Sequence, residues 1–151
     1  MFTLVPVNFF SPQSAREALS EVAPLTEGSR VSYKEIPLFG AVLVYEIPDG
    51  ADAPPEIFDL LQALPSCREY NKVLCSWKGG FLSIAVAQGR SLLLANEYPA
   101  ADFVTAQYYI FLSLKSLQLN PEITTIRFRT PLTEEEEMML YRYFKAVETE
   151  V

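Results

Sequence analysis

The stretch from Lys72 to Arg129 constrains the fold of this chain more than any other part of the sequence. It contains the strand-like runs VLCSW, FLSIAVA and RSLLLANE, separated by glycine turns, and then a long helical pattern and the run ITTIRFR. Two tight turns predict an antiparallel three-stranded meander. Because a full helix precedes the fourth run, we expect that run to pair in parallel after a right-handed crossover. The stretch therefore predicts a mixed α/β fold in which helices cover the sheet.

The middle strand of the expected meander has two unlike faces. Side chains alternate along a strand, so Leu82, Ile84 and Val86 share one face, and Ser83, Ala85 and Ala87 share the other. We expect another element to pack closely against the face of small residues.

The helix expected over 102–118 is apolar around most of its circumference, and Asp102 is a suitable N-cap. One stripe holds Phe103, Ile110, Leu114 and Leu117, and a neighbouring stripe holds Val104, Tyr108 and Phe111. Such a helix is usually buried on more than one side, so we expect it to meet another helix or subunit. We predict interface residues at Tyr108, Tyr109, Phe111 and Leu112, with one of the two tyrosines in the core.

The segment 1–65 is predicted to contain a strand, a helix, a hairpin and a second helix. The expected elements are a strand over 2–5, a helix over about 12–21, strands over 31–36 and 41–47, and a helix from Pro55 that stops at Pro65. We interpret residues 48–55 as a surface loop. The whole chain, 1–151, is predicted to be one domain in which this segment precedes a core over 72–147.

A last helix is predicted from Thr133, because Thr133 and Glu136 have the spacing of a capping box. Its expected apolar side consists of Met138, Leu140, Tyr141, Phe144 and Val147. The acidic run 134–137 could suggest a cation site, but its place in the first helical turn favours a solvated capping role.

Composition excludes several classes of function. The net charge of −7 argues against nucleic acid or an anionic membrane surface as the main partner, since both attract basic proteins. No apolar run approaches the ~20 residues of a spanning helix, so we expect no membrane insertion. The chain has no histidine, which excludes Ser-His-Asp and Cys-His sites. Two cysteines, Cys67 and Cys75, fit a reduced, cytoplasmic setting.

Three groups of residues are candidates for chemistry. Cys75 is expected to be a small buried residue rather than a nucleophile. The turn Lys78-Gly79-Gly80 could cradle a phosphate, but it lacks the spacing of a Walker loop, and a plain hairpin turn is favoured. Arg127 and Arg129 share one face of a strand, where they could bind an anion or, as we favour, pair with glutamates of the last helix.

The order of elements from Lys72 onward is the order that opens each half of the actin-like ATPase superfamily. The runs FTLVPVNFF, VLVYEIP, FLSIAVAQGRSLLLANEY and ADFVTAQYYIFLSLKSLQLNPE resemble a family of uncharacterised bacterial proteins, a domain of unknown function, with the actin-like ATPase fold. The resemblance covers Phe2 to about Phe144. It implies half of an actin-like fold and a short member that lacks the N-terminal lobe of the family.

The same resemblance implies where chemistry should lie. In ATP-hydrolysing relatives, the first strand of the meander bears an Asp, and a glycine-rich turn follows; together they hold Mg²⁺ and phosphate. Here Cys75 or Ser76 stands near the Asp position, so we expect no catalytic residue, no metal and no cofactor.

Two functions follow as hypotheses. The first is a non-catalytic protein-interaction or scaffold module, expected to form a homodimer. The alternative is a nucleotide-binding protein or weak phosphotransferase that uses Lys78, Gly79 and Gly80 for ATP with Mg²⁺. A third idea, small-molecule sensing beside Trp77, rests on that aromatic side chain alone.

Overall fold

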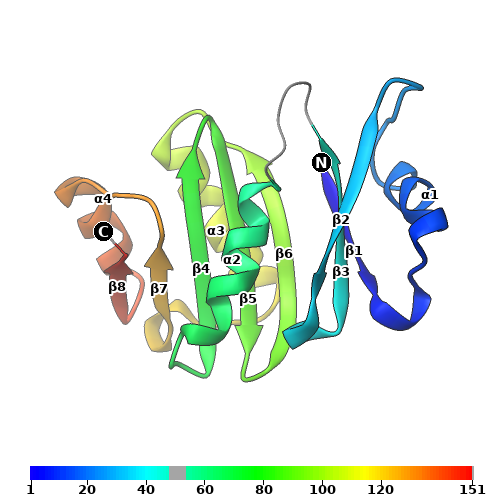
Figure 1. Cartoon of the computed structure of the whole chain (residues 1–151). Coiled ribbons are helices and arrows are strands. Elements are labelled where there is room, and N and C mark those ends of the chain that lie inside the picture. The colour runs from blue at the N-terminus through cyan, green and yellow to red at the C-terminus, as the bar shows by residue number, and fades with distance from the viewer. Residues whose placement is uncertain (48–53, 151) are drawn as a thin grey trace. The chain divides into compact units, whose positions relative to one another are not determined.

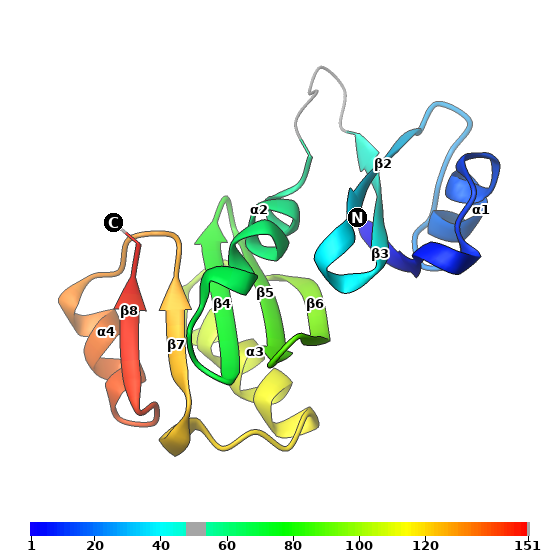
Figure 2. The same cartoon turned by 60° about the horizontal axis from the view of Figure 1, so that its bottom comes forward.

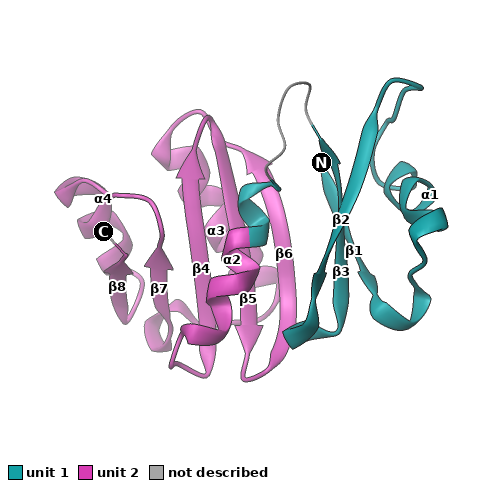
Figure 3. Ribbon diagram, viewed as in Figure 1, with its two compact units in different colours: residues 1–58 teal, residues 59–151 magenta. Residues whose placement is uncertain are grey.

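The computed structural model describes residues 1–47 and 54–150 of the chain (Figure 1). It divides into two compact units, residues 1–58 and 59–151 (Figure 3). The boundary falls inside a helix and close to the division expected between the segment 1–65 and the core 72–147. That the two units form one domain stays a prediction. The loop expected at 48–55 lies outside the described residues except for Pro54 and Pro55.

Unit 1 is a three-stranded antiparallel sheet with one helix on it. The strand order is β1-β3-β2. Its elements are β1 Phe2–Pro6, η1 Val7–Phe9, η2 Pro12–Ser14, α1 Ala15–Ser20, β2 Arg30–Ile36, η3 Pro37–Phe39 and β3 Ala41–Ile47. The side chains of Ala15 and Leu19 pack with Val42 and Val44, so α1 covers one face of the sheet. The expected strand, helix and hairpin are present, although the helix is divided into η2 and α1.

Unit 2 is a five-stranded mixed sheet with the order β6-β5-β4-β7-β8. Helix α2 Glu56–Ala63 spans the boundary between the units. The elements that follow it are η4 Leu64–Ser66, β4 Asn71–Lys78, β5 Phe81–Gln88, β6 Ser91–Pro99, α3 Phe103–Ser116, η5 Pro121–Ile123, β7 Thr125–Phe128, α4 Glu134–Tyr141 and β8 Ala146–Thr149. The antiparallel meander β4-β5-β6 and the parallel pairing of β7 with β4 are present as expected.

Helices cover both faces of this sheet. α2 lies over one face and α3 over the other (Figures 1 and 2). The bulky side chains Leu82, Ile84 and Val86 join one buried cluster with Ile110 of α3 and Leu140 of α4. α3 and α4 therefore pack on the same face of the sheet, α3 against β5 and β6 of the meander and α4 against β8.

The small-residue face of β5 is the face that α2 and η4 cover. Ser83, Ala85 and Ala87 are buried, and η4 contacts both β4 and β5. Leu60 and Leu61 of α2 are themselves fully buried. The expectation that an element packs closely against the small residues is confirmed.

The prediction for the end of the chain was wrong in part. Thr133 and Glu136 form the expected capping box, but α4 ends at Tyr141, and the strand β8 follows it. Val147 therefore lies on a strand that pairs in parallel with β7, and Phe144 lies in the turn before it. The spacing of Phe144 and Val147 imitates one helical turn, but both side chains reach the core from non-helical backbone.

We predict that Ala85→Leu destabilises the protein, because the added methylenes have no room between β5 and the elements that cover it. The expected loss is about 1–3 kcal/mol of unfolding free energy, seen as a melting temperature lower by roughly 3–10 °C. Ala101→Leu adds the same atoms at an exposed position and serves as the control. Equal melting temperatures for the two variants would show that the small-residue face is not closely packed.

Candidate functional site

The end of strand β4 is the first candidate site, because the resemblance places a metal-holding carboxylate there. Cys75 is fully buried in the core cluster on the α3 face of the sheet. Burial raises the pKa of the Cys75 thiol far above its ordinary value. Ser76 is also buried. An un-ionised thiol inside an apolar core is a packing group, as expected for Cys75, and is not an activated nucleophile.

Trp77 has a structural role at the same end of β4. Its indole Nε1–H donates to the carbonyl oxygen of Ala100 at 3.0 Å, and its ring meets Phe103 edge-on with centroids 5.6 Å apart. The backbone N–H of Trp77 donates to Thr130 Oγ1 at 3.0 Å. These contacts tie β4 to the start of α3 and to the loop after β7.

The turn Lys78-Gly79-Gly80 has the geometry of a tight hairpin. Gly79 and Gly80 have φ of +60° and +78°, the left-handed conformation that suits two-residue turns between antiparallel strands. The N–H of Ala100 donates to the carbonyl oxygen of Gly80 at 2.8 Å. A side chain at either glycine would meet open space. The glycines therefore serve the backbone conformation, which is what the hairpin interpretation of this turn requires.

The charge next to this turn is negative. Asp102 follows Ala100 by two residues, and its carboxylate accepts a hydrogen bond from the Thr105 N–H at 2.8 Å. That hydrogen bond to the N-terminus of α3 holds the pKa of Asp102 below its ordinary value. A carboxylate already occupies the position where a helix N-terminus could receive a phosphate. Within residues 1–47 and 54–150, no group of three or more His, Cys, Asp or Glu side chains could hold a metal ion.

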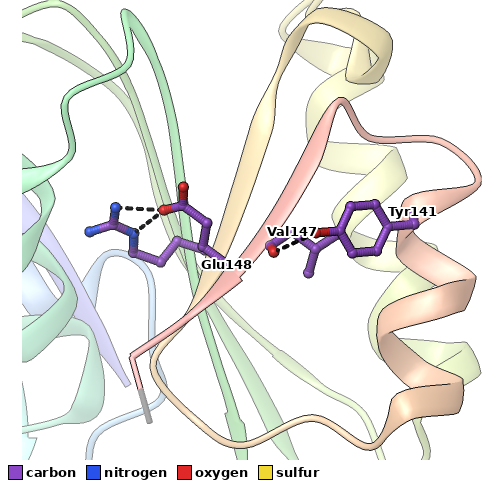
Figure 4. A network of polar contacts seen from close by, with 4 residues as sticks. Tyr141, Val147 and Glu148 are labelled. Atoms are coloured by element: carbon purple, nitrogen blue, oxygen red, sulfur yellow. Dashed lines mark hydrogen bonds and ion pairs between the residues drawn. The ribbon is translucent and has the colours of Figure 1, made fainter.

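Arg127 and Arg129 pair with acidic residues, but the predicted partners on the last helix were wrong. Arg127 binds Glu148 of β8, with Nη2 and Oε2 2.7 Å apart (Figure 4), and this hydrogen bond raises the pKa of Arg127. Arg129 Nε lies 3.4 Å from Glu150 Oε2. The glutamates of α4 are not these partners, because the strand β8 places Glu148 directly opposite Arg127.

Helix α4 is joined to β8 by a second polar contact. The hydroxyl of Tyr141 donates to the carbonyl oxygen of Val147 at 3.1 Å (Figure 4). The Arg127–Glu148 pair joins the edge strand β8 to β7, and the Tyr141 hydrogen bond joins β8 to α4. Arg127 of β7 and Arg129, which follows the strand, thus both pair with acidic residues near the end of the chain.

The exposed side of α3 is the second candidate site. Val104, Tyr108 and Leu112 follow one another at every fourth residue and are 67%, 55% and 44% exposed. A shallow groove of about 370 Å³ is lined by Val104, Gln107, Tyr108, Phe111 and Tyr143. We call these five residues and Leu112 the α3 patch. Its side chains are apolar or uncharged, which suits contact with another protein surface.

The four predicted interface residues occupy different positions. Tyr108 and Leu112 are exposed. Tyr109 packs against the core and stacks on Tyr98 with centroids 4.4 Å apart. Phe111 contacts both the core and the ring of Tyr143, 4.9 Å away. One tyrosine faces the core and one faces solvent, as the two helix faces indicated; a role in an interface stays a prediction.

Sequence reasoning missed Gln107 and Tyr143 as parts of this surface. Gln107 lies one turn before Phe111 on the same helix, so helical spacing could have identified it. Tyr143 follows α4 and reaches the groove through the turn before β8, a position that the expected longer helix concealed.

Two comparisons with known proteins agree with this architecture. Residues 57–147 match the model of a family described as "Protein of unknown function (DUF3822)". A crystal structure from Bacteroides thetaiotaomicron, of a protein with actin-like ATPase fold and unknown function, is similar with a TM-score of 0.78 and 19% sequence identity. The similarity covers 98% of this chain and 64% of that chain. No curated protein matches. The likeness confirms the predicted actin-like fold, and this chain spans less than two thirds of that protein.

Among the described residues, no helix is both long and apolar enough to cross a membrane.

We predict that Cys75 does not react with a thiol reagent in the native protein. Its pKa is raised by burial, so at pH 8 the native side chain remains a thiol, whereas the unfolded chain has the ordinary value of 9.0. In Cys67→Ser, the aromatic disulfide reagent used to count thiols should detect none before denaturant is added and one afterwards. Rapid native labelling would contradict the buried position.

The same shift has a pH dependence of known sign. A thiol whose pKa is raised on folding contributes stability that is fully present below the unfolded value of 9.0 and is lost as the pH rises above it. Cys75→Ala should therefore flatten the loss of unfolding free energy above pH 9, as measured by urea titrations at several pH values. An identical pH profile for the variant and the native chain would contradict the assignment.

Proposed function

This chain belongs to the DUF3822 family of proteins of unknown function, and we propose that it is a non-catalytic protein-interaction or scaffold module with an actin-like ATPase fold. The observation that carries the proposal is the α3 patch, an uncharged surface on a helix whose other side is buried in the core. Exposed apolar surfaces of this kind commonly mark protein–protein contacts.

The partner that we propose is a second copy of the chain. The protein is acidic, with 19 Asp and Glu against 12 Lys and Arg, so two copies meet best through surfaces that carry no charge. None of the residues of the α3 patch is charged. Six residues are few beside the ~20–30 that a standard interface takes from each partner, so the expected dimer is weak, with a dissociation constant in the micromolar range.

The environment of β4 supports a non-catalytic role. The strand carries Cys75 and Ser76 where the resemblance places a metal-holding carboxylate, and both side chains are buried. Phosphoryl transfer depends on metal ions that neutralise charge on the phosphates. We place the module in the bacterial cytoplasm, which suits its two free cysteines.

The alternative is a nucleotide-binding protein or weak phosphotransferase. The fold and the open space around Gly79 and Gly80 favour it. The carboxylate of Asp102 near the same turn disfavours a triphosphate unless Mg²⁺ accompanies it. ATP with Mg²⁺ is thus the cofactor that this alternative requires, with Lys78 as the cation nearest the phosphates.

We predict a dimer that depends on the α3 patch. Tyr108→Glu combined with Leu112→Glu places like charges in the contact and should raise the dimer dissociation constant about a hundredfold or more, as measured by sedimentation equilibrium. Leu38→Glu combined with Ile123→Glu changes two equally exposed apolar residues outside the patch and should leave the constant unchanged. A native chain that is monomeric at tens of micromolar would refute the homodimer.

A thermal-shift series separates the module from its alternative. ATP or ADP with Mg²⁺ at a hundred times its dissociation constant would add ~2.7 kcal/mol to the unfolding free energy. We expect no increase in melting temperature at millimolar nucleotide. An increase that Lys78→Ala abolishes, while Lys115→Ala does not, would establish the nucleotide site instead.

A further inference from the structure

The edge strand β1 and the helix α1 form a second groove, which lies within unit 1. Its volume is about 320 Å³, and its lining includes Leu4, Val5, Phe9, Glu17, Glu21 and Val22. β1 is an outer strand of its sheet, and α1 contacts it directly (Figures 1 and 2). A groove between an edge strand and a helix has the shape that receives an extended peptide as an added strand.

The backbone of β1 has hydrogen-bonding groups that point away from β3. The N–H of Val7 donates to Gly40 O at 2.9 Å, and Met1 O accepts from the N–H of Glu46 at 3.1 Å. Met1 and Val7, which make these two bonds, are both odd-numbered. In an antiparallel pair, residues that bond to the neighbouring strand alternate with residues that do not, so the even-numbered residues of β1 do not bond to β3.

It follows that Phe2 and Leu4 each direct an N–H and a C=O to the open edge, and Pro6 directs a C=O. Among the described residues, no turn, loop or side-chain hydrogen bond to these groups is present. Unpaired edge groups of this kind are a template for another strand. Pro6, which has no N–H, limits the template to the length of β1.

Part of the lining of the groove is apolar. Phe9 is 81% exposed and Val22 is 62% exposed, although both are large apolar side chains. They stand at the rim of the groove, where side chains of an added strand would cover them. Burial of this apolar surface adds to the hydrogen bonds that the backbone of β1 provides.

The charge of the groove is negative. Glu17 and Glu21 lie one turn apart on and after α1, and both are exposed. Neither forms an ion pair within the described residues. The neighbouring cation, Arg16, donates from Nη1 to Ser29 O at 2.6 Å and from Nη2 to Thr26 O, so its guanidinium is held by the loop before β2. Among the described residues that line the groove, none is a lysine or an arginine.

We propose that this groove binds an extended, basic segment of a partner protein by adding it to β1 as a strand. The charge complementarity of Glu17 and Glu21 selects lysine or arginine on the side of the added strand that faces α1. A second copy of this chain is disfavoured as the occupant, because its net charge is −7. The groove shares no residue with the α3 patch. A negative result for peptide binding would therefore leave the proposed homodimer untouched, and the reverse also holds.

In the test, the full chain is titrated with an acetylated octapeptide of alternating lysine and valine. Binding is monitored by the NMR chemical shifts of the backbone amides of the chain. The amides of Phe2 and Leu4 should shift on titration, together with those of Glu17 and Val22. The counterpart peptide with glutamate in place of lysine should bind about tenfold more weakly or worse, because two like-charge contacts replace two ion pairs.

Glu17→Lys combined with Glu21→Lys should weaken binding of the lysine peptide about tenfold or more. Glu27→Lys combined with Glu35→Lys makes the same change in net charge at exposed positions outside the groove and should leave the affinity within about twofold. Leu4→Pro, which removes one outward N–H, should also weaken binding; if that variant fails to fold, the charge variants decide.

Three outcomes would overturn the proposal. The first is equal binding of the lysine and glutamate peptides, and the second is equal loss in the two pairs of charge variants. The third is the absence of shifts at Phe2 and Leu4, whether the peptide binds elsewhere or not at all. The oligomeric state should stay that of the native chain in every variant, which separates this result from that of the α3 patch.

Discussion

The burial of β5 on both faces is the constraint on which unit 2 depends. Leu82, Ile84 and their neighbours form one core cluster with the inner side of α3, while Ala85 and the small residues beside it are buried on the opposite face, over which α2 lies (Figure 1). A sheet covered on both sides requires apolar side chains on both sides of its central strands. The neighbouring strand β4 obeys the same rule, and Cys75 and Ser76 are buried at the end where an ATPase of this fold would need an exposed carboxylate. The proposal of a non-catalytic role rests on this packing.

Helix α3 is arranged by the same constraint. Its inner side, with Ile110 and Leu114, completes the core, and its outer side, with Tyr108 and Leu112, remains in contact with solvent. A helix that is apolar on both sides gains from the core only what its inner side buries. The outer side is therefore available for association. In unit 1, the open edge of β1 offers a second and chemically different surface, in which hydrogen bonds and two carboxylates replace aromatic contact.

Much of this fold could be predicted from the sequence, because its signals are local. Alternation in 81–87, glycines at two turns and the N-cap Asp102 each depend only on neighbouring residues, and all three predictions were right. The features that were wrong or missed depend on contacts between distant segments. Phe144 and Val147 have helical spacing, yet parallel pairing with β7 makes a strand of 146–149. The predicted partner of Arg127, a glutamate of the last helix, was wrong for the same reason, because the strand β8 supplies Glu148 instead. The sequence indicated the α3 side of one groove but neither groove as a whole, because Tyr143 and the edge of β1 become parts of a surface only when each unit folds.

Association through the α3 patch can be measured by hydrogen exchange of the α3 amides at two protein concentrations about a hundredfold apart. If two copies associate through the α3 patch, exchange of the segment 103–116 should slow at the higher concentration, while exchange of β2 stays the same. In the double variant Tyr108→Glu with Leu112→Glu, exchange of this segment should be equally fast at both concentrations. Exchange of 103–116 that is independent of concentration in the native chain, or protection confined to another surface, would contradict the account.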